Sequence, residues 1–258
     1  TNVSNGATLT TNRYGESNKA YNFSNDYITV SQTNMSSNTT LSISVWVNCS
    51  NYASDYRTIC TAKGNITRVS YQLNVQQSTG KPYFYGGGVT IVSPYTLSLN
   101  TWHHIVVTLN GTNVRIYIDG DLKITATQND PLEALDQSGD FYIGYNESIN
   151  PDWWSGKLDD LRIYSITLTE RQVKDIYDEP PSVIKWQLTK TSLNAEMIFN
   201  TNNSKSTSEK LKIDKDGDSQ FTGNITIQDK TEIVSHSDLL GWWKLDGNVN
   251  DSSGNSYN

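Results

Sequence analysis

The chain has 258 residues, with 20 Lys or Arg against 27 Asp or Glu, so its formal net charge at pH 7 is −7. This acidic balance argues against nucleic-acid binding, which needs a dense cationic face. Asn (27), Ser (29) and Thr (28) are abundant, and these short polar side chains favour turns and exposed strand faces over helix interiors. The composition predicts a folded, β-rich protein and excludes a helical bundle or a disordered chain.

The 258 residues contain no apolar run that approaches the length of a membrane span, and their first residues are not a cationic-then-apolar leader. We therefore expect no membrane insertion, and we expect this chain to be a mature, processed or excised piece of something longer.

Strand signals dominate the chain up to about residue 165. In residues 41–48, Leu41, Ile43, Val45 and Val47 alternate with other side chains at period two, which is typical of a half-buried strand. Asn-Gly at 110–111 and Asp-Gly at 119–120 favour tight hairpin turns. Further strands are predicted at residues 69–75, 102–109, 114–118, 122–124, 141–145 and 158–164. Many strands at this spacing indicate an antiparallel sandwich.

One helix is predicted at residues 169–178. Thr169 and Gln172 form a capping box, and Val173, Ile176 and Tyr177 make the buried stripe of a short helix. Two prolines at 180–181 end it and begin a linker.

The composition changes between residues 182 and 237. A hairpin is predicted over residues 211–227, with its turn at Asp216-Gly217, where an EF-hand-like acidic run lacks the EF-hand spacing. Large apolar groups are few, so this unit is not expected to bury an adequate core alone.

The two cysteines, Cys49 and Cys60, do not have the spacing of a metal-binding pair. If their strands are hairpin neighbours, a disulfide would close a small loop and stabilise the fold by about 2–3 kcal/mol. Two free thiols are the alternative.

Glycosylation sequons are about twice as frequent as chance would give. We predict a heavily glycosylated surface, with compositional bias as the alternative. The sequons lie at Asn2, Asn22, Asn34, Asn38, Asn48, Asn65, Asn110, Asn146, Asn202, Asn224 and Asn250.

Five motifs in one order carry a family resemblance. They are Ser-Val-Trp at 44–46, Trp-His-His-Ile-Val-Val at 102–107, Ile-Tyr-Ile-Asp-Gly at 116–120, Phe-Tyr-Ile-Gly at 141–144, and Gly-Lys-Leu-Asp-Asp-Leu-Arg-Ile-Tyr at 156–164. Residues 41–178 resemble the laminin-G-like branch of the concanavalin A-like lectin/glucanase superfamily. The resemblance implies an all-β, antiparallel two-sheet jelly-roll sandwich used in binding carbohydrate or protein. The unit at 179–238 is expected to be a small β-rich connector.

The C-terminal residues 239–258 resemble the opening of such a domain, and the N-terminus resembles the part of the domain that comes directly after that opening. We therefore predict one period of a tandem array. In this interpretation, residues 1–178 form a jelly roll lacking its first strand, 179–238 form the connector, and 239–258 supply the first strand of the next domain by strand addition. A chain that ends arbitrarily within a second, different domain is the alternative.

Catalytic chemistry is not expected. Glucanases of the superfamily carry a run of paired Glu and Asp on one strand, and no such run is present. Calcium is predicted instead, because clustered carboxylates and amides are its preferred ligands. The proposed ligands are Asp246, Asn248 and Asp251, with Asp159 or Asp160 from the penultimate strand, and a solvated turn is the alternative.

Glycan binding needs exposed aromatic rings beside planar polar groups. Trp153 and Trp154, with Tyr145 and Asn146 nearby, are the leading ligand-binding candidates, and packing of a Trp into the core is the alternative. We therefore predict a non-enzymatic, extracellular or virion-surface module that assembles with neighbouring copies of itself into a fibre. The alternative is a lectin-like adhesion domain that binds surface glycans.

Overall fold

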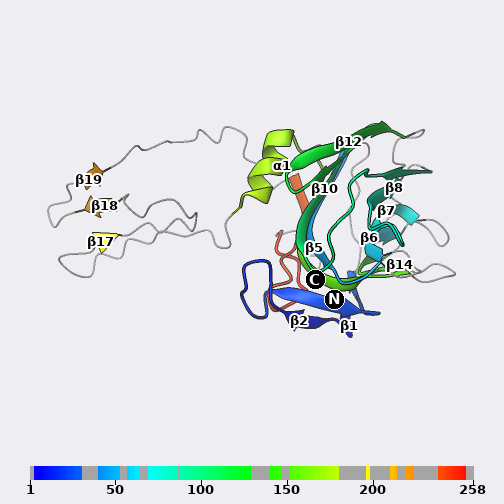
Figure 1. Ribbon diagram of the computed structural model, residues 1–258, viewed down its shortest axis with the longest axis horizontal. Helices are drawn as coiled ribbons and strands as arrows, with labels where there is room; N and C mark the ends of the chain where they lie inside the picture. The colour runs from blue at the N-terminus through cyan, green and yellow to red at the C-terminus, as the bar shows by residue number, and fades with distance from the viewer. Residues whose placement is uncertain are drawn as a thin grey trace. The chain divides into compact units, whose positions relative to one another are not determined.

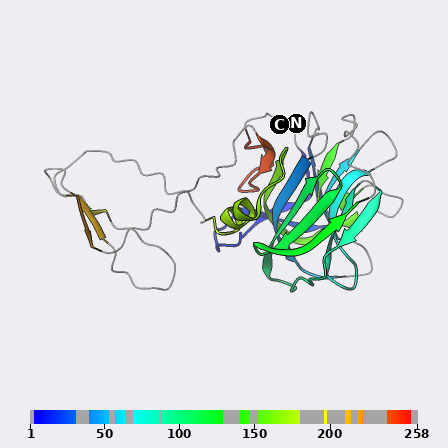
Figure 2. The same cartoon turned by 90° about the horizontal axis from the view of Figure 1, so that it is seen from above.

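The computed structural model describes residues 3–30, 40–52, 57–63, 69–86, 88–128, 140–146, 152–179, 196–197, 210–213, 219–222 and 238–253. The chain divides into two compact units, of which the first combines Thr1–Pro181 with Ile233–Asn258 and the second is Ser182–Glu232. The first unit consists of two antiparallel sheets packed face to face (Figures 1 and 2). The predicted all-β, two-sheet sandwich is therefore confirmed.

One sheet has seven strands among the described residues. Its spatial order is β1 (Val3–Asn5), β4 (Tyr27–Val30), β13 (Phe141–Ile143), β6 (Arg57–Lys63), β7 (Val69–Val75), β8 (Pro82–Gly86) and β9 (Val89–Val92). A separate two-stranded ribbon, β14 (Tyr145–Asn146) with β15 (Asp152–Trp153), follows β13 in the chain.

The other sheet has eight strands among the described residues. Seven of them follow the order β12 (Asp121–Thr127), β11 (Asn113–Ile118), β10 (Trp102–Asn110), β5 (Thr40–Cys49), β16 (Ser155–Tyr164), β3 (Ala20–Ser24) and β2 (Thr8–Thr10). The eighth, β20 (Leu239–Trp243), pairs with residues Leu161–Tyr164 of β16, while β3 pairs with residues Ser155–Leu158 of the same edge. The C-terminal segment thus completes this sheet within its own chain.

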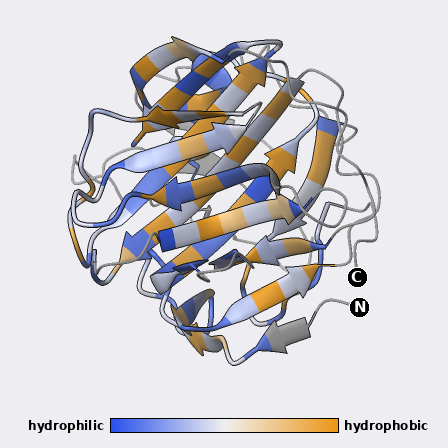
Figure 3. Ribbon diagram, turned by 90° about the vertical axis from the view of Figure 1, so that its right-hand side faces the viewer, coloured by the Kyte–Doolittle hydropathy of each residue, from blue (hydrophilic) through white to orange (hydrophobic). Residues whose placement is uncertain are grey.

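The core lies between the two sheets. Leu41, Ile43, Val45 and Val47 of β5 are all buried there, as their alternation predicts. Figure 3 shows the same alternation of apolar and polar residues along the strands. Because successive strand residues point to opposite faces, each sheet also has an outer face that points away from the other sheet.

Part of the outer face of the eight-stranded sheet is covered by the helix α1 (Glu170–Tyr177). Both bonds of the predicted capping box are present at Thr169 and Gln172, and Val173 and Ile176 are buried. No helix in the described part of the chain is long and apolar enough to cross a membrane.

The single strand predicted at residues 141–145 is wrong, because the structure breaks it into β13 and β14. Gly144 lies between them with φ of +83°, and an added Cβ would approach Phe23 Cδ1 at 2.6 Å. Only glycine adopts this conformation without strain, so the chain turns here and changes the direction of Tyr145.

The disulfide prediction is also wrong, since Cys49 and Cys60 are both free and buried. Cys49 ends β5 in one sheet and Cys60 lies on β6 in the other, so their strands are not hairpin neighbours. Burial raises the pKa of Cys49 to about 11 and of Cys60 to about 12, which keeps both thiols protonated.

The second unit contains a small sheet of β17 (Glu196–Met197), β18 (Lys210–Ile213) and β19 (Ser219–Thr222). β18 and β19 pair antiparallel, from Lys210 with Thr222 to Ile213 with Ser219, so the predicted hairpin is present. Its predicted turn at residues 216–217 lies outside the described residues.

Candidate ligand-binding site

Four partly exposed aromatic side chains lie together beside the seven-stranded sheet. We call Tyr27, Tyr142, Tyr145 and Trp153 the aromatic cluster. The ring centroids of Tyr145 and Trp153 are 4.4 Å apart, and those of Tyr27 and Tyr145 are stacked at 4.9 Å. Tyr142 joins them edge-on at 5.5 Å from Tyr145. The cluster is therefore a preformed aromatic surface drawn from four separate strands.

The local sequence explains this arrangement. Tyr142 points outward because Phe141 and Ile143 on either side of it are buried in the core. Tyr145 and Trp153 face one another because they are directly paired across the β14–β15 ribbon.

A buried arginine fixes the position of Trp153. Arg57 Nη1 donates to the carbonyl oxygen of Trp153 at 3.2 Å, while its other nitrogens donate to the carbonyl and side-chain oxygens of Asn51. Only 7% of Arg57 is exposed, so the guanidinium is a rigid support. It holds β15 through the backbone and leaves the Trp153 ring uncovered by this contact.

The other two predicted ligand residues lie deeper. Asn146 is 5% exposed, and its amide nitrogen donates to Gln72 Oε1 at 3.0 Å. Trp154 is fully buried in the core, because it follows the outward-facing Trp153 in an extended segment. Trp154 therefore packs in the core, which was the alternative to ligand binding. Trp153 and Tyr145 are partly exposed, so a ligand could contact them.

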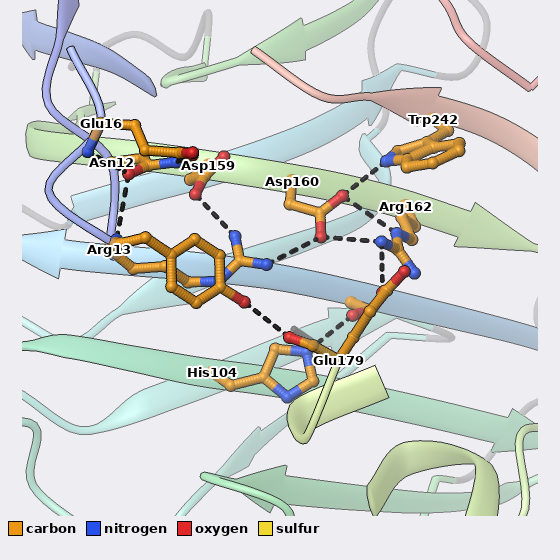
Figure 4. Close-up of polar contacts among 11 residues, drawn as sticks. Asn12, Arg13, Glu16, His104, Asp159, Asp160, Arg162, Glu179 and Trp242 are labelled. Carbon is orange, nitrogen blue, oxygen red and sulfur yellow. Dashed lines mark hydrogen bonds and ion pairs between the residues drawn. The ribbon is translucent and has the colours of Figure 1, made fainter. Parts of the chain in front are cut away.

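A second polar arrangement lies at the bulge of β16, where Asp160 has φ of +52° (Figure 4). Arg13 Nη1 lies 2.6 Å from Asp159 Oδ2, and Arg162 Nη2 lies 2.9 Å from Asp160 Oδ2. Arg162 also contacts Glu179 at 2.6 Å, and Trp242 Nε1 donates to Asp160 Oδ1 at 2.5 Å. This ion-pair network ties β16 to the loop of Arg13, to the end of α1 and to β20.

The two aspartates of the network differ in protonation. Burial alone would raise the pKa of Asp160, but the Arg162 and Arg13 guanidinium groups hold it below its ordinary value. Burial raises the pKa of Asp159 to about 7, and the nearby charge of Asp160 adds to this effect. Three carboxylates share two guanidinium groups here, so one surplus negative charge favours proton uptake.

The residues predicted to bind calcium have other partners in this structure. Asp246 lies 3.6 Å from Lys19 Nζ, and Asp251 Oδ1 accepts from the backbone N–H of Trp242 at 2.8 Å. Asn248 Oδ1 accepts from the Asn250 N–H, as in a solvated turn. Within the described ranges, no group of three or more His, Cys, Asp or Glu side chains is arranged to hold a metal. Calcium binding stays a prediction.

Two histidines form pairs that sequence reasoning did not anticipate. His103 Nδ1 lies 2.8 Å from Asp119 Oδ2, and His103 Nε2 accepts from the Ser98 N–H. His104 Nε2 lies 2.8 Å from Ser44 Oγ, and burial lowers the pKa of His104 to about 3. Both pairs lie in the eight-stranded sheet and its loops, where they brace the strand β10.

Five of the eleven predicted glycosylation sites fall within the described residues. Asn110 and Asn250 are exposed, Asn22 and Asn48 are half-buried, and Asn146 is buried. A bulky glycan suits the first two positions, whereas Asn146 is engaged with Gln72. Occupancy stays a prediction, and the other sites (Asn2, Asn34, Asn38, Asn65, Asn202 and Asn224) lie outside the described residues.

Sequence reasoning missed Tyr27, Tyr142 and Arg57 as parts of the aromatic site. The alternation of Phe141, Tyr142 and Ile143 was a usable signal for an outward Tyr142. No local pattern marks Tyr27 or Arg57, because only strand pairing across the sheet brings them to β14 and β15.

Comparison with solved structures finds the same fold in binding domains. Domain 4 of an extracellular arabinanase from Geobacillus stearothermophilus, in complex with arabinotriose, is 20% identical, with a TM-score of 0.54 over 69% of this chain and 87% of that one. A candidate carbohydrate-binding protein from Bacteroides ovatus is 24% identical, with a TM-score of 0.50, and the alignment covers 60% of this chain but 45% of that one. The binding domain of botulinum neurotoxin serotype D is 19% identical, with a TM-score of 0.52 over 69% of this chain and 46% of that one.

The neighbours are mainly binding domains, although a sialidase mutant from Trypanosoma rangeli also shares the fold. No curated protein sequence matches the chain. The family described as the concanavalin A-like lectin/glucanases superfamily matches residues 22–174, which is more than half of the chain. With its two-sheet antiparallel sandwich, the chain therefore belongs to the laminin G-like group of the concanavalin A-like lectin/glucanases superfamily.

Proposed function

We propose that this chain is a non-enzymatic adhesion module, displayed outside the cell or on a virion, that binds glycans through the aromatic cluster. The carrying observation is the preformed surface of Tyr27, Tyr145 and Trp153, whose rings lie within 6 Å of one another. Sugar C–H faces pack on aromatic rings, and sugar hydroxyls bond to nearby amides such as that of Gln72. The arabinotriose complex of the similar arabinanase domain supports a saccharide ligand.

The acidic residues on β16 favour binding over hydrolysis. A glycosidase needs one carboxyl as acid and a second carboxylate on the other side of the scissile bond. Asp159 and Asp160 are buried and ion-paired with Arg13 and Arg162, so neither is presented to a sugar.

The test uses a panel of four trisaccharides: arabinotriose, maltotriose, cellotriose and the acidic 3′-sialyllactose. Titration calorimetry should detect binding to the wild-type chain and at least a tenfold loss of affinity in Trp153→Ala. Trp102→Ala is the matched control, since Trp102 is a half-buried tryptophan of the eight-stranded sheet. Absence of binding across the panel and on a wider glycan array, or equal losses in both variants, would contradict the proposal.

A second function is favoured by the position of β20. Its Trp243 is fully buried and stacks on Phe141 with centroids 5.4 Å apart, so the sandwich depends on this strand. We propose that in a fibre or tandem array the 239–258 segment of one copy occupies this place in the next copy. β20 follows the rest of its sheet only after residues 180–237, and this separation along the chain supports the exchange.

An engineered disulfide in the full chain tests strand exchange, because it forms between chains if β20 is exchanged and within one chain if it is not. The Ser165 N–H donates to the Asp238 carbonyl oxygen at 2.8 Å, so a Ser165→Cys/Asp238→Cys variant should form a disulfide next to β20. Exchange predicts a ladder of covalent oligomers on a non-reducing gel, and closure within each chain predicts monomers alone. The buried Cys49 and Cys60 should not contribute, and the wild-type chain controls for them.

A further inference from the structure

The C-terminal segment carries hydrogen-bond partners for the outer edge of its own strand. We call residues 238–253 the donor segment. Asp251 Oδ1 accepts from the Trp242 N–H at 2.8 Å, and the Ser252 N–H donates to the Trp242 carbonyl oxygen at 2.7 Å. β20 therefore pairs with β16 on one edge, while residues of its own segment bind the other edge. A donor segment that moves as one unit takes this protection of the strand edge with it.

The edge of β16 that receives β20 is shaped by a β-bulge. The register with β5 shifts between Asp159 and Arg162, and Asp160 within the bulge has φ of +52°. Arg162 Nε donates to Asp160 Oδ1 at 3.0 Å, and Arg162 Nη2 donates to Asp160 Oδ2 at 2.9 Å. Asp160 is 7% and Arg162 9% exposed. This two-point ion pair holds the carboxylate in one orientation through residues of β16 itself.

Trp242 of the donor segment makes two side-chain contacts at this edge. Its Nε1–H donates to Asp160 Oδ1 at 2.5 Å (Figure 4), and the guanidinium carbon of Arg162 lies 4.6 Å from the centroid of its ring. A phenylalanine would offer Arg162 a ring but would offer Asp160 no donor, while an amide side chain would offer only the donor. The pair of Asp160 and Arg162 therefore favours tryptophan at this position.

The residues beside Trp242 add a requirement of shape. Trp243 is fully buried in the core and stacks on Phe141. Its ring lies over Gly241, where an added Cβ would approach Trp243 Cη2 at 2.5 Å. Glycine is needed here because any side chain would collide with the ring. The sequence Gly-Trp-Trp at 241–243 is therefore what this edge and the core accept together.

The strand β3 occupies the other part of the same β16 edge and provides a comparison. It pairs with Ser155–Leu158 through the backbone, and its Tyr21 and Phe23 are buried. Within the described ranges, no hydrogen bond or ion pair joins a side chain of β3 to a side chain of β16. Recognition of a strand by charged side chains is thus confined to the part of the edge that binds β20.

We propose that the β16 edge with Asp160 and Arg162 is a strand-binding site for the donor segment of a neighbouring copy, and that Trp242 identifies the incoming strand. This inference rests on the proposed strand exchange and extends it to the residues that select the partner. Backbone pairing accepts many sequences, so side-chain contacts supply the selectivity of strand addition. The site therefore prefers a copy of this chain to other apolar strands.

A synthetic peptide of residues 238–253 carrying Asp238→Cys tests the site in the full chain. The receiving chain is Ser165→Cys, because the Ser165 N–H donates to the Asp238 carbonyl oxygen and a bound peptide should form a disulfide there. Adding Trp243→Ala to the receiving chain weakens its own β20 and should increase the adduct, measured by intact mass spectrometry. The chain without Trp243→Ala is tested beside it, so the result does not depend on the folding of the weakened variant.

Competition between peptides measures the selectivity. Equal amounts of the peptide with Trp242 and of a peptide with benzothienylalanine at this position are mixed with the receiving chain. Benzothienylalanine keeps the size and ring face of tryptophan and lacks the N–H, so we expect about tenfold less adduct from it. A peptide with Asn250→Ala is the control, since Asn250 is exposed, and it should compete equally with the tryptophan peptide.

The outcomes separate this inference from the exchange on which it rests. Equal adducts of the tryptophan and benzothienylalanine peptides would overturn selection by Asp160, and the absence of any adduct would overturn the strand-binding site. The oligomer ladder of the Ser165→Cys/Asp238→Cys chain tests exchange between copies independently. A ladder without selectivity between the peptides would overturn this inference alone. Selectivity with monomers alone would support the site and overturn exchange between full chains.

Discussion

His104 and Asp159 are two buried ionisable residues of the eight-stranded sheet whose pKa values move in opposite directions. Burial lowers the pKa of His104 from 6.5 to about 3 and raises that of Asp159 from 3.8 to about 7. In both cases burial favours the neutral form. The two residues should therefore make opposite contributions to the pH dependence of stability.

His104 should make the protein less stable as the pH falls. Below pH 6.5 the unfolded chain binds a proton at this residue, whereas the folded chain does not until about pH 3. The free energy of unfolding should decrease between these limits by at most about 1.4 kcal/mol per pH unit. Urea unfolding of the wild type and of His104→Asn at pH 4, 5, 6 and 7 tests this. An unchanged pH dependence in the variant would contradict it.

Asp159 should act in the opposite sense over nearly the same range. The folded chain keeps a proton on Asp159 up to about pH 7, while the unfolded chain releases it above about pH 3.8. This group therefore lowers the free energy of unfolding as the pH rises from 3.8 to 7. In the same urea series, Asp159→Asn should make stability rise more steeply with pH than in the wild type. If the free energy of unfolding of Asp159→Asn instead rises less steeply with pH than that of the wild type, Arg13 keeps Asp159 ionised in the folded chain.

At the scale of elements, the capping box of α1 should contribute to the stability of the fold. Thr169 Oγ1 accepts from the Gln172 N–H, and the Gln172 side chain accepts from the Thr169 N–H at 2.8 Å. Thr169→Ala should destabilise the fold by about 1 kcal/mol, because the Gln172 N–H loses the Thr169 hydroxyl as its acceptor. The loss should appear in urea unfolding at pH 7. Thr169→Ser keeps the hydroxyl and should retain most of the stability; an equal loss in both variants would exclude the cap as the cause.

Elements with strong periodicity were predictable, and breaks within strands were not. The strand at 69–75 and the helix with its capping box have local signals, and the structure places both where predicted. The break at Gly144 arises from close contact with Phe23, a residue more than a hundred positions away in the chain. A local pattern cannot report such a contact, since it depends on packing between elements.

At the scale of the whole molecule, the last strand should be essential for stability. Trp243 is fully buried against Phe141, and Leu245 beyond it is also fully buried. Trp243→Ala should cost about 3–5 kcal/mol, measured as the shift in free energy of unfolding in urea. Trp102→Ala, which removes a half-buried ring from the same sheet, is expected to cost much less. A loss in Trp243→Ala as small as the loss expected for Trp102→Ala would show that β20 is dispensable.

The candidate site illustrates the same limit of sequence reasoning. Trp153 and Trp154 are adjacent and chemically alike, yet one lies in the aromatic cluster and the other in the core. Their separation follows from the alternation of an extended chain, but which of the two faces outward depends on the register of β14 with β15. Sequence alone could nominate the pair and could not choose between them.

The β-rich class, the main strands, the capped helix and the family follow from local periodicity and from short ordered motifs, so they could be predicted from the sequence. The folded arrangement was needed to place Cys49 and Cys60 in different sheets and to pair Asp159 and Asp160 with arginines. It also brought Tyr27, Tyr142, Tyr145 and Trp153 together. The physical reason is that strand pairing joins residues far apart in the chain, so charge partners and ring contacts are set by the sheet.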